Sequence, residues 1–154
     1  MKTPGGRILA TDFGTRRIGL AVSDALGITA QGLPTLERTR LEDDLEHIRQ
    51  LAEEYSVERV ILGNPIGASG RKTAMSERVE AFAQKLRRRL ACPVELWDER
   101  LTSVEAHRLL RESGIGIEKR RRAADRVAAS LLLQTYLDRR AHELGPPPAS
   151  GGGA

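Results

Sequence analysis

The spacing of the apolar residues changes along this chain, and that change restricts the fold more than any other feature. In the first forty residues they recur at every second position, most clearly in Arg17–Ser23. Ile18, Leu20 and Val22 share one face of this segment, and the opposite face carries only small residues. We therefore expect a strand that is covered on both sides. Further along, apolar residues recur every three or four positions, which is typical of amphipathic helices.

These periods predict strands first, and then helices that alternate with short strands. Successive strands joined by short turns run antiparallel, whereas strand–helix–strand connections make parallel neighbours. The expected fold class is therefore α/β, with a mixed five-stranded sheet flanked by helices. In it the first three strands are antiparallel and the first, fourth and fifth are parallel. The predicted strands are Arg7–Asp12, Arg17–Ser23, Ile28–Leu36, Arg59–Leu62 and Pro93–Trp97. Four helices are predicted. The apolar face of the first extends from Leu41 to Tyr55 and that of the second from Met75 to Leu90, the third begins at a Thr102–Glu105 capping box, and the last runs from about Arg121 to Arg139.

The length of 154 residues predicts a single domain. We expect a flexible segment at 1–6, the domain at 7–140 and a disordered tail rich in glycine and proline at 141–154. The single cysteine, Cys92, excludes a disulfide framework within one chain. We find neither a signal peptide nor a membrane-spanning run, so we expect a cytoplasmic protein without a membrane partner.

Three acidic residues are predicted to meet at one edge of the sheet. Asp12 follows the first strand and Glu99 the fifth, and the carboxyl ends of parallel strands form such edges. Asp125 lies in the apolar part of the last helix, where a buried carboxylate must be paired, protonated or bound to a metal. Gathered carboxylates select hard cations, so we expect Mg²⁺ or Mn²⁺, with two ions clamping a phosphodiester. The alternatives are a turn-capping role for Asp12 and an ion pair of Asp125 with a neighbouring arginine.

Two basic runs suggest a polyanionic partner to different degrees. Lys85–Arg89 suits the solvated end of a helix, where cations complement the dipole. Lys119–Arg122 precedes Asp125 near a helix start, where phosphate contact is a stronger alternative. Loops at the same sheet edge contain further candidates for nucleic-acid contact. For each of them the alternative is that it is an ordinary loop residue without a binding role. The predicted nucleic-acid contacts are Thr15, Arg16, Arg17, Asn64, Arg71, Arg100, Lys119 and Arg121.

Four ordered blocks of this sequence resemble the YqgF or RuvX family. They are Thr11–Asp24, Val60–Pro65, Trp97–Ala106 and Ala124–Ala129. The resemblance implies a ribonuclease H-like fold related to Holliday junction resolvases, and a nuclease that matures the leading end of the small-subunit ribosomal RNA precursor. It places the family's acidic positions on Asp12, Glu99 and Asp125. Two departures are that Ala10 and Thr11 replace a glycine and an apolar residue, and that no acid precedes Gly70.

Several alternatives to this function stay open on the sequence. One is a Holliday junction resolvase that cuts branched DNA, and another is a binding module that keeps the fold without catalysis. A third is a nucleotide-phosphate enzyme, because Asp12–Thr15 also resembles the phosphate loop of actin-like ATPases, although those enzymes need two such domains. The expected assembly is a monomer or a weak homodimer that binds structured nucleic acid.

Overall fold

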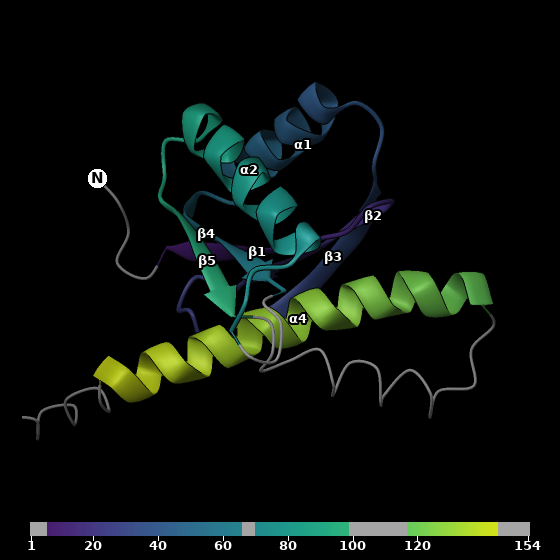
Figure 1. The fold of residues 1–154 in the computed structure, drawn as a ribbon. Coiled ribbons are helices and arrows are strands. Elements are labelled where there is room, and N and C mark those ends of the chain that lie inside the picture. The colour runs from purple at the N-terminus through teal and green to yellow at the C-terminus, as the bar shows by residue number, and fades with distance from the viewer. Residues whose placement is uncertain (1–5, 66–69, 99–116, 145–154) are drawn as a thin grey trace, which may run out of the picture.

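The computed structural model describes residues 6–65, 70–98 and 117–144, and within the last range the side chains of 126–142. Three layers make up this part of the chain: a five-stranded sheet lies between helices α1 and α2 on one face and the long helix α4 on the other (Figure 1). The strands are β1 (Arg7–Phe13), β2 (Arg17–Ser23), β3 (Ala30–Glu37), β4 (Val57–Asn64) and β5 (Val94–Asp98), and the helices are α1 (Leu41–Glu54), α2 (Ala74–Arg89) and α4 (Ile117–Leu144).

The sheet has the strand order β3-β2-β1-β4-β5. β2 pairs antiparallel with both β1 and β3, whereas β4 pairs parallel with both β1 and β5. The short connections between the first three strands allow only antiparallel pairing, and helix α2 provides the crossover that makes β4 and β5 parallel. The predicted fold class is therefore confirmed, including the parallel arrangement of the first, fourth and fifth strands.

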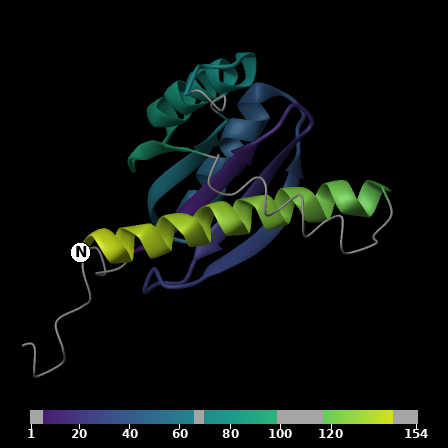
Figure 2. The same ribbon diagram turned by 60° about the horizontal axis from the view of Figure 1, so that its bottom comes forward.

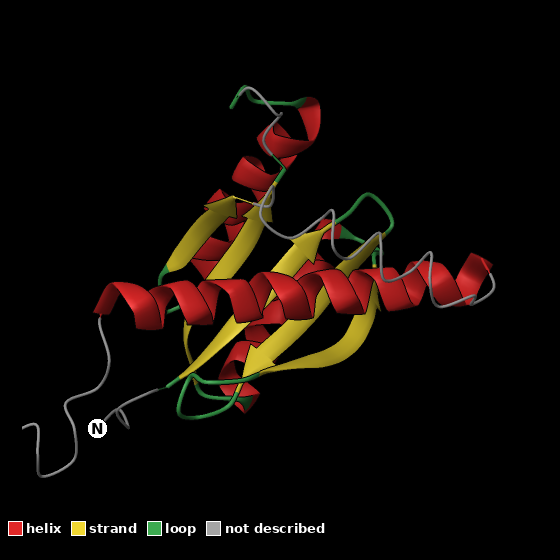
Figure 3. Cartoon of the chain, turned by 90° about the horizontal axis from the view of Figure 1, so that it is seen from below, coloured by secondary structure: helices red, strands yellow, loops and turns green. Residues whose placement is uncertain are grey.

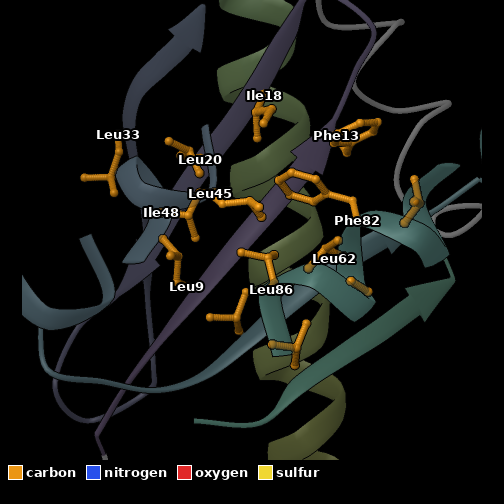
Figure 4. Close-up of a cluster of buried hydrophobic side chains, with 14 of the residues drawn as sticks. Leu9, Phe13, Ile18, Leu20, Leu33, Leu45, Ile48, Leu62, Phe82 and Leu86 are labelled. Carbon is orange, nitrogen blue, oxygen red and sulfur yellow. The ribbon is translucent and has the colours of Figure 1, made fainter. Parts of the chain in front are cut away.

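Alternate residues along the strands contribute their side chains to two separate hydrophobic cores, one on each face of the sheet. Leu9 and Phe13 of β1 point to the side of α1 and α2, where they join Phe82 and Leu86 of α2 (Figure 4). Ile8 and Ala10 point to the other side. There the core is completed by residues of α4, namely Ala129, Leu132, Leu133, Tyr136 and Leu137. The central strands are thus buried on both faces, as the alternation in 17–23 predicts.

Helix α4 crosses its face of the sheet obliquely (Figures 2 and 3). Its last turns lie near the start of β1, where Leu137 and Ile8 line a common cavity. Further back along the helix, Arg126 covers Gly32 of β3, where an added Cβ would lie only 2.6 Å from Arg126 Cγ. Gly32 therefore lets the helix approach the sheet closely.

The described elements differ from the predicted ones mainly at their ends. α4 spans 28 residues, from Ile117 to Leu144, and exceeds the predicted 121–139 in both directions. Apolar periodicity defines only the buried part of a helix, and polar residues of good helix propensity extend it beyond that part. The predicted helix that begins at Thr102 lies outside the described residues. Within the described part of the chain, no helix has the length and apolarity needed to span a bilayer.

Candidate functional site

Three polar residues stand at the carboxyl ends of the three parallel strands. Asp12 lies near the end of β1, Asn64 ends β4 and Asp98 ends β5. The register pairs Thr11 with Leu62, and Asn64 with Asp98. All three residues therefore lie at the same edge of the sheet, which is the edge predicted for Asp12 and for the loop that carries Asn64. Because adjacent strands are about 4.8 Å apart, Asp12 and Asp98 flank the β4 strand at a separation of roughly 10 Å.

The pleat of the strands sends these side chains to different faces. Asp12 lies two residues after Ala10, which faces α4, so the two residues share one face of the strand. Asp98 alternates in step with Leu96, which packs on the core beneath α1 and α2. Asp12 therefore belongs to the α4 face and Asp98 to the opposite face. Asp98, the last residue of β5, is therefore not on the face of Asp12.

Asn64 carries a buried oxygen that has no partner in the described part of the chain. The residue is only 8% exposed, and its Oδ1 makes no hydrogen bond there. Leaving a buried acceptor unsatisfied costs about 1–3 kcal/mol, so such atoms are rare and call for a specific explanation. At this edge, a hydrogen-bond donor or a hard cation would satisfy the oxygen.

A tight hairpin turn follows Asp12. The main-chain nitrogen of Gly14 donates to the carbonyl oxygen of Arg17 at 2.9 Å, which closes the turn. Thr15 and Arg16 at its tip are exposed, as nucleic-acid contacts require. Arg17 instead forms an ion pair with Glu37 of β3, with an Nε–Oε1 distance of 3.0 Å. The charge of Arg17 is therefore already partly balanced within the sheet.

The start of α2 is fixed beside the end of β4. Thr73 and Ser76 form a reciprocal capping box, and the Thr73 hydroxyl donates to the carbonyl oxygen of Pro65 at 3.0 Å. Arg71, two residues before this cap, is exposed. The contact between Thr73 and Pro65 therefore brings Arg71 to the edge where Asn64 ends β4.

The remaining predicted residues are placed only by their backbone or not at all. Glu99 and Arg100 lie outside the described residues. Asp125 belongs to α4, four residues before the fully buried Ala129. Lys119 and Arg121 belong to the first two turns of the same helix. Among the side chains that the structure describes, no three carboxylate, histidine or cysteine groups come close enough to hold a metal ion.

Arg38 and Asp44 are functional candidates that the sequence reasoning missed. Asp44 is fully buried in the first turn of α1 and pairs with Arg38, whose guanidinium also contacts the turn after Asp12. An acid in the first turn of a helix is ordinarily explained by the helix dipole. The signal available in the sequence was the position of Asp44 next to Leu45, on the buried side of the helix.

Shifted pKa values in the described residues have local causes. Burial and the nearby carboxylate of Glu95 raise the pKa of Tyr136, whose ring packs edge-on against Trp97 at a centroid distance of 5.2 Å. Backbone N–H groups of Ile28 and Thr29 lower the pKa of Asp24 in the hairpin between β2 and β3. Asp24 lies after β2, away from the edge that carries Asp12, so its shift reflects turn formation.

A mixed sheet in this order, with helices on both faces, defines the ribonuclease H-like fold. Two solved structures share the fold. RuvC of T. thermophilus, in complex with Holliday junction substrate, aligns with a TM-score of 0.51 at 13% identity, covering 88% of this chain and 95% of that one. The Fowlpox virus resolvase, in complex with Holliday junction DNA, aligns with a TM-score of 0.54 at 11% identity, covering 87% and 98%.

The chain belongs to the RuvX family, whose model is described as "Holliday junction resolvase" and matches residues 6–139. A relative from Koribacter versatilis, named "Putative pre-16S rRNA nuclease", is 50% identical over 153 residues, which cover 97% of this chain and 100% of the relative. A relative of the same name from Heliobacterium modesticaldum is 43% identical over 136 residues, covering 88% and 91%. The resemblance found in the four sequence blocks is therefore confirmed, and so is the class of enzyme, a nuclease.

Proposed function

We propose that this chain is a metal-dependent endonuclease that cleaves the precursor of 16S ribosomal RNA near its 5′ end. The observation that carries the proposal is the match, at 50% identity, to the full length of a relative with that named activity. Branched DNA is the second candidate substrate, because the family description names the Holliday junction. A monomer or weak homodimer would suffice for RNA, where one strand is cut.

The groups at the sheet edge fit a hard cation such as Mg²⁺ or Mn²⁺. Asn64 lies two residues after Leu62, so its side chain belongs to the face of α1 and α2 and is not placed with Asp12. Asp12 supplies a half-buried carboxylate on the α4 face. Oxygen ligands of this kind suit Mg²⁺ and Mn²⁺ better than softer metals. When bound, two such ions would supply Lewis-acid activation of the attacking water and charge stabilisation for the departing alkoxide.

We assign the metal-holding and catalytic role to Asp12, Glu99 and Asp125. The α4 face supports this set, because Ala10 and Ala129 pack in one buried cluster. Ala10 precedes Asp12 by two residues, and Ala129 follows Asp125 by one helical turn. Three carboxylates in one pocket repel one another, and that repulsion is what makes the pocket bind cations.

We assign phosphate contact to the basic and polar residues around this edge. The exposed turn after Asp12 and the exposed Arg71 before α2 present donors to the backbone of the substrate. The first two turns of α4 add a run of four cations. The proposed contacts are Thr15, Arg16, Arg17, Asn64, Arg71, Arg100, Lys119 and Arg121.

A cleavage assay with two substrates tests this function. The substrates are an end-labelled precursor RNA that spans the mature 5′ end of 16S rRNA, and a four-way DNA junction. Each is incubated with Mn²⁺, with Mg²⁺ and with EDTA. We expect cleavage of the RNA that requires metal and is lost, by about 10³-fold or more, in Asp12→Asn.

Asp43→Asn is the matched control, because Asp43 is an exposed aspartate in the first turn of α1. It should cleave like the unmodified protein. Cleavage of the junction while the RNA stays intact would replace the proposed substrate with branched DNA. Binding of both substrates without cleavage under every metal condition would contradict a nuclease and favour a binding module.

A further inference from the structure

Arg38 connects the end of β3 to the turn that follows Asp12. Its main-chain nitrogen donates to the carbonyl oxygen of Arg16 at 2.9 Å. Its Nη1 donates to the carbonyl oxygens of Gly14 at 3.2 Å and of Thr15 at 3.4 Å. Its guanidinium carbon lies 4.5 Å from the centre of the Phe13 ring. One side chain thus contacts the three consecutive residues that come directly after Asp12.

Asp44 of α1 holds the Arg38 guanidinium through an ion pair. The Asp44 side chain is fully buried, and its Oδ2 accepts from Arg38 Nε at 3.4 Å. Its Oδ1 accepts from the main-chain nitrogen of Thr39 at 3.1 Å. A buried carboxylate is stable only when its oxygens are satisfied, so both contacts are needed. Asp44 thereby fixes the guanidinium at the point where α1 meets the sheet.

Arg38 bonds the outer side of the turn through the carbonyl oxygens of Gly14 and Thr15. Gly14 has no side chain, and its closing hydrogen bond to Arg17 lies on the inner side of the hairpin. Thr15 and Arg16 are exposed. The ring of Phe13 is a further anchor, because it lies between the Arg38 guanidinium and the Phe82 ring. The centres of the Phe13 and Phe82 rings are 4.6 Å apart. The planar fork of the guanidinium donates from separate nitrogens, Nε to the carboxylate and Nη1 to the carbonyl oxygens, whereas a lysine presents all its donors from one nitrogen.

We propose that Arg38, held by Asp44, is a positioning residue that sets the orientation of the Asp12 carboxylate. It acts by fixing the turn of residues 13–17, into which Asp12 leads directly. This inference rests on the proposed function, in which Asp12 binds the metal ions. In this inference Arg38 acts through the turn and not by contact with substrate or metal, because its guanidinium is engaged by Asp44, by two carbonyl oxygens and by the Phe13 ring.

Kinetics of Arg38→Met and Arg38→Lys on the precursor RNA test the proposal. A displacement of a reacting group by about 1 Å costs on the order of 100-fold in rate, so we expect kcat to fall about 10- to 100-fold in Arg38→Met. KM should change less than about threefold, and the dissociation constant for Mn²⁺, measured by calorimetry on the full chain, should rise. Arg38→Lys should recover only part of the loss, because it keeps the charge without the fork. Arg49→Met, which removes an arginine from ion pairs with Glu46 and Glu53 on the outer face of α1, is the matched control.

Asp44→Asn and the double variant add a test of the link between the two residues. If Asp44 acts through Arg38, then Arg38→Met combined with Asp44→Asn should be no slower than Arg38→Met alone. Hydrogen exchange at the amide of Gly14, which closes the turn by donating to Arg17, should accelerate in Arg38→Lys, a variant chosen to stay folded. This second readout does not depend on activity.

The outcomes separate this inference from the proposed function. If Asp12→Asn still cleaves, the proposed function itself fails. If Asp12→Asn is inactive but Arg38→Met keeps its kcat, the positioning role of Arg38 alone is overturned. A raised KM with unchanged kcat in Arg38→Met would also overturn it, because that pattern identifies a direct substrate contact.

Discussion

At the scale of single residues, the geometry around Asp12 depends on a glycine that cannot be replaced without movement. A Cβ added at Gly14 would lie 2.6 Å from the carbonyl oxygen of Arg17, which is the oxygen that closes the turn. That oxygen belongs to the backbone of a paired strand and cannot move aside cheaply. The turn therefore selects glycine for close approach, and the same turn receives Arg38.

Gly14→Ala should destabilise the protein by about 1–3 kcal/mol, the usual range for inserting an atom into a packed region. It should also lower the cleavage rate of the molecules that remain folded, because the turn opens beside Asp12. Urea unfolding measures the first effect, and cleavage per folded molecule measures the second.

Gly27→Ala is the control for this variant. Gly27 has a φ of +71°, which strains any other residue, but an added Cβ there meets no atom within 4 Å. It lies in the hairpin between β2 and β3, away from Asp12. It should lose stability while keeping full activity per folded molecule. Equal loss of activity in both variants would show that the turn at Gly14 has no special relation to catalysis.

At the scale of elements, the two basic runs occupy opposite ends of their helices. Arg87, Arg88 and Arg89 lie in the last turn of α2, where cations complement the dipole. Arg87 donates to the carbonyl oxygen of Val94, and Arg89 pairs with Glu42 of α1. The first run therefore has structural partners, in agreement with its predicted role as a helix end. The second run lies in the first turns of α4, where the dipole disfavours cations, so a bound polyanion explains it better.

Lys119→Ala or Arg121→Ala should therefore weaken RNA binding and flatten its salt dependence. Each lost phosphate contact on a single strand should reduce the slope of log K against log salt concentration by about 0.7. Binding titrations at several salt concentrations measure this slope. Arg88→Ala, at the end of α2, should leave it unchanged. An equal change of slope in all three variants would mean that RNA binding depends on the total charge of the protein and not on the position of these residues.

At the scale of the whole molecule, α4 covers one face of the sheet by itself, whereas α1 and α2 share the other (Figure 1). The proposed site joins the start of the chain to its last helix, since Asp12 belongs to β1 and Asp125 to α4. A cation held by both would link the two ends of the sequence. It would bind the folded state and not the unfolded one, and so stabilise the fold.

Mn²⁺ at 100 times its dissociation constant should add about 2.7 kcal/mol of stability. For a chain of this size, that corresponds to a rise in Tm of roughly 5–10 °C. Thermal unfolding with Mn²⁺ and with EDTA measures the rise, which should vanish in Asp12→Asn and persist in Asp43→Asn. A rise that survives in Asp12→Asn would place the ion elsewhere on the protein.

Much of this architecture could be predicted because it depends on local periodicity and on chain order. The alternation in Arg17–Ser23 predicted a strand buried on both faces, and β2 is buried on both. The strand–helix–strand order predicted parallel neighbours, and this placed Asp12, Asn64 and Asp98 at one edge. Helix α4 was predicted too short at both ends, because its outer turns lack the apolar periodicity on which the prediction depends. The catalytic roles of Glu99 and Asp125 stay predictions.

Sequence by itself determined the strands, their parallel or antiparallel directions and the acid near the end of β1, since these follow from short-range patterns and from the lengths of the connections. Tertiary structure alone decided that Asp98 faces away from Asp12, that Asn64 buries an oxygen with no partner among the described residues, and that Arg38 reaches the turn after Asp12. The physical reason is distance along the chain. Arg38 and Gly14 are 24 positions apart, and only the pairing of β3 with β2 and the packing of α1 on the sheet bring them together.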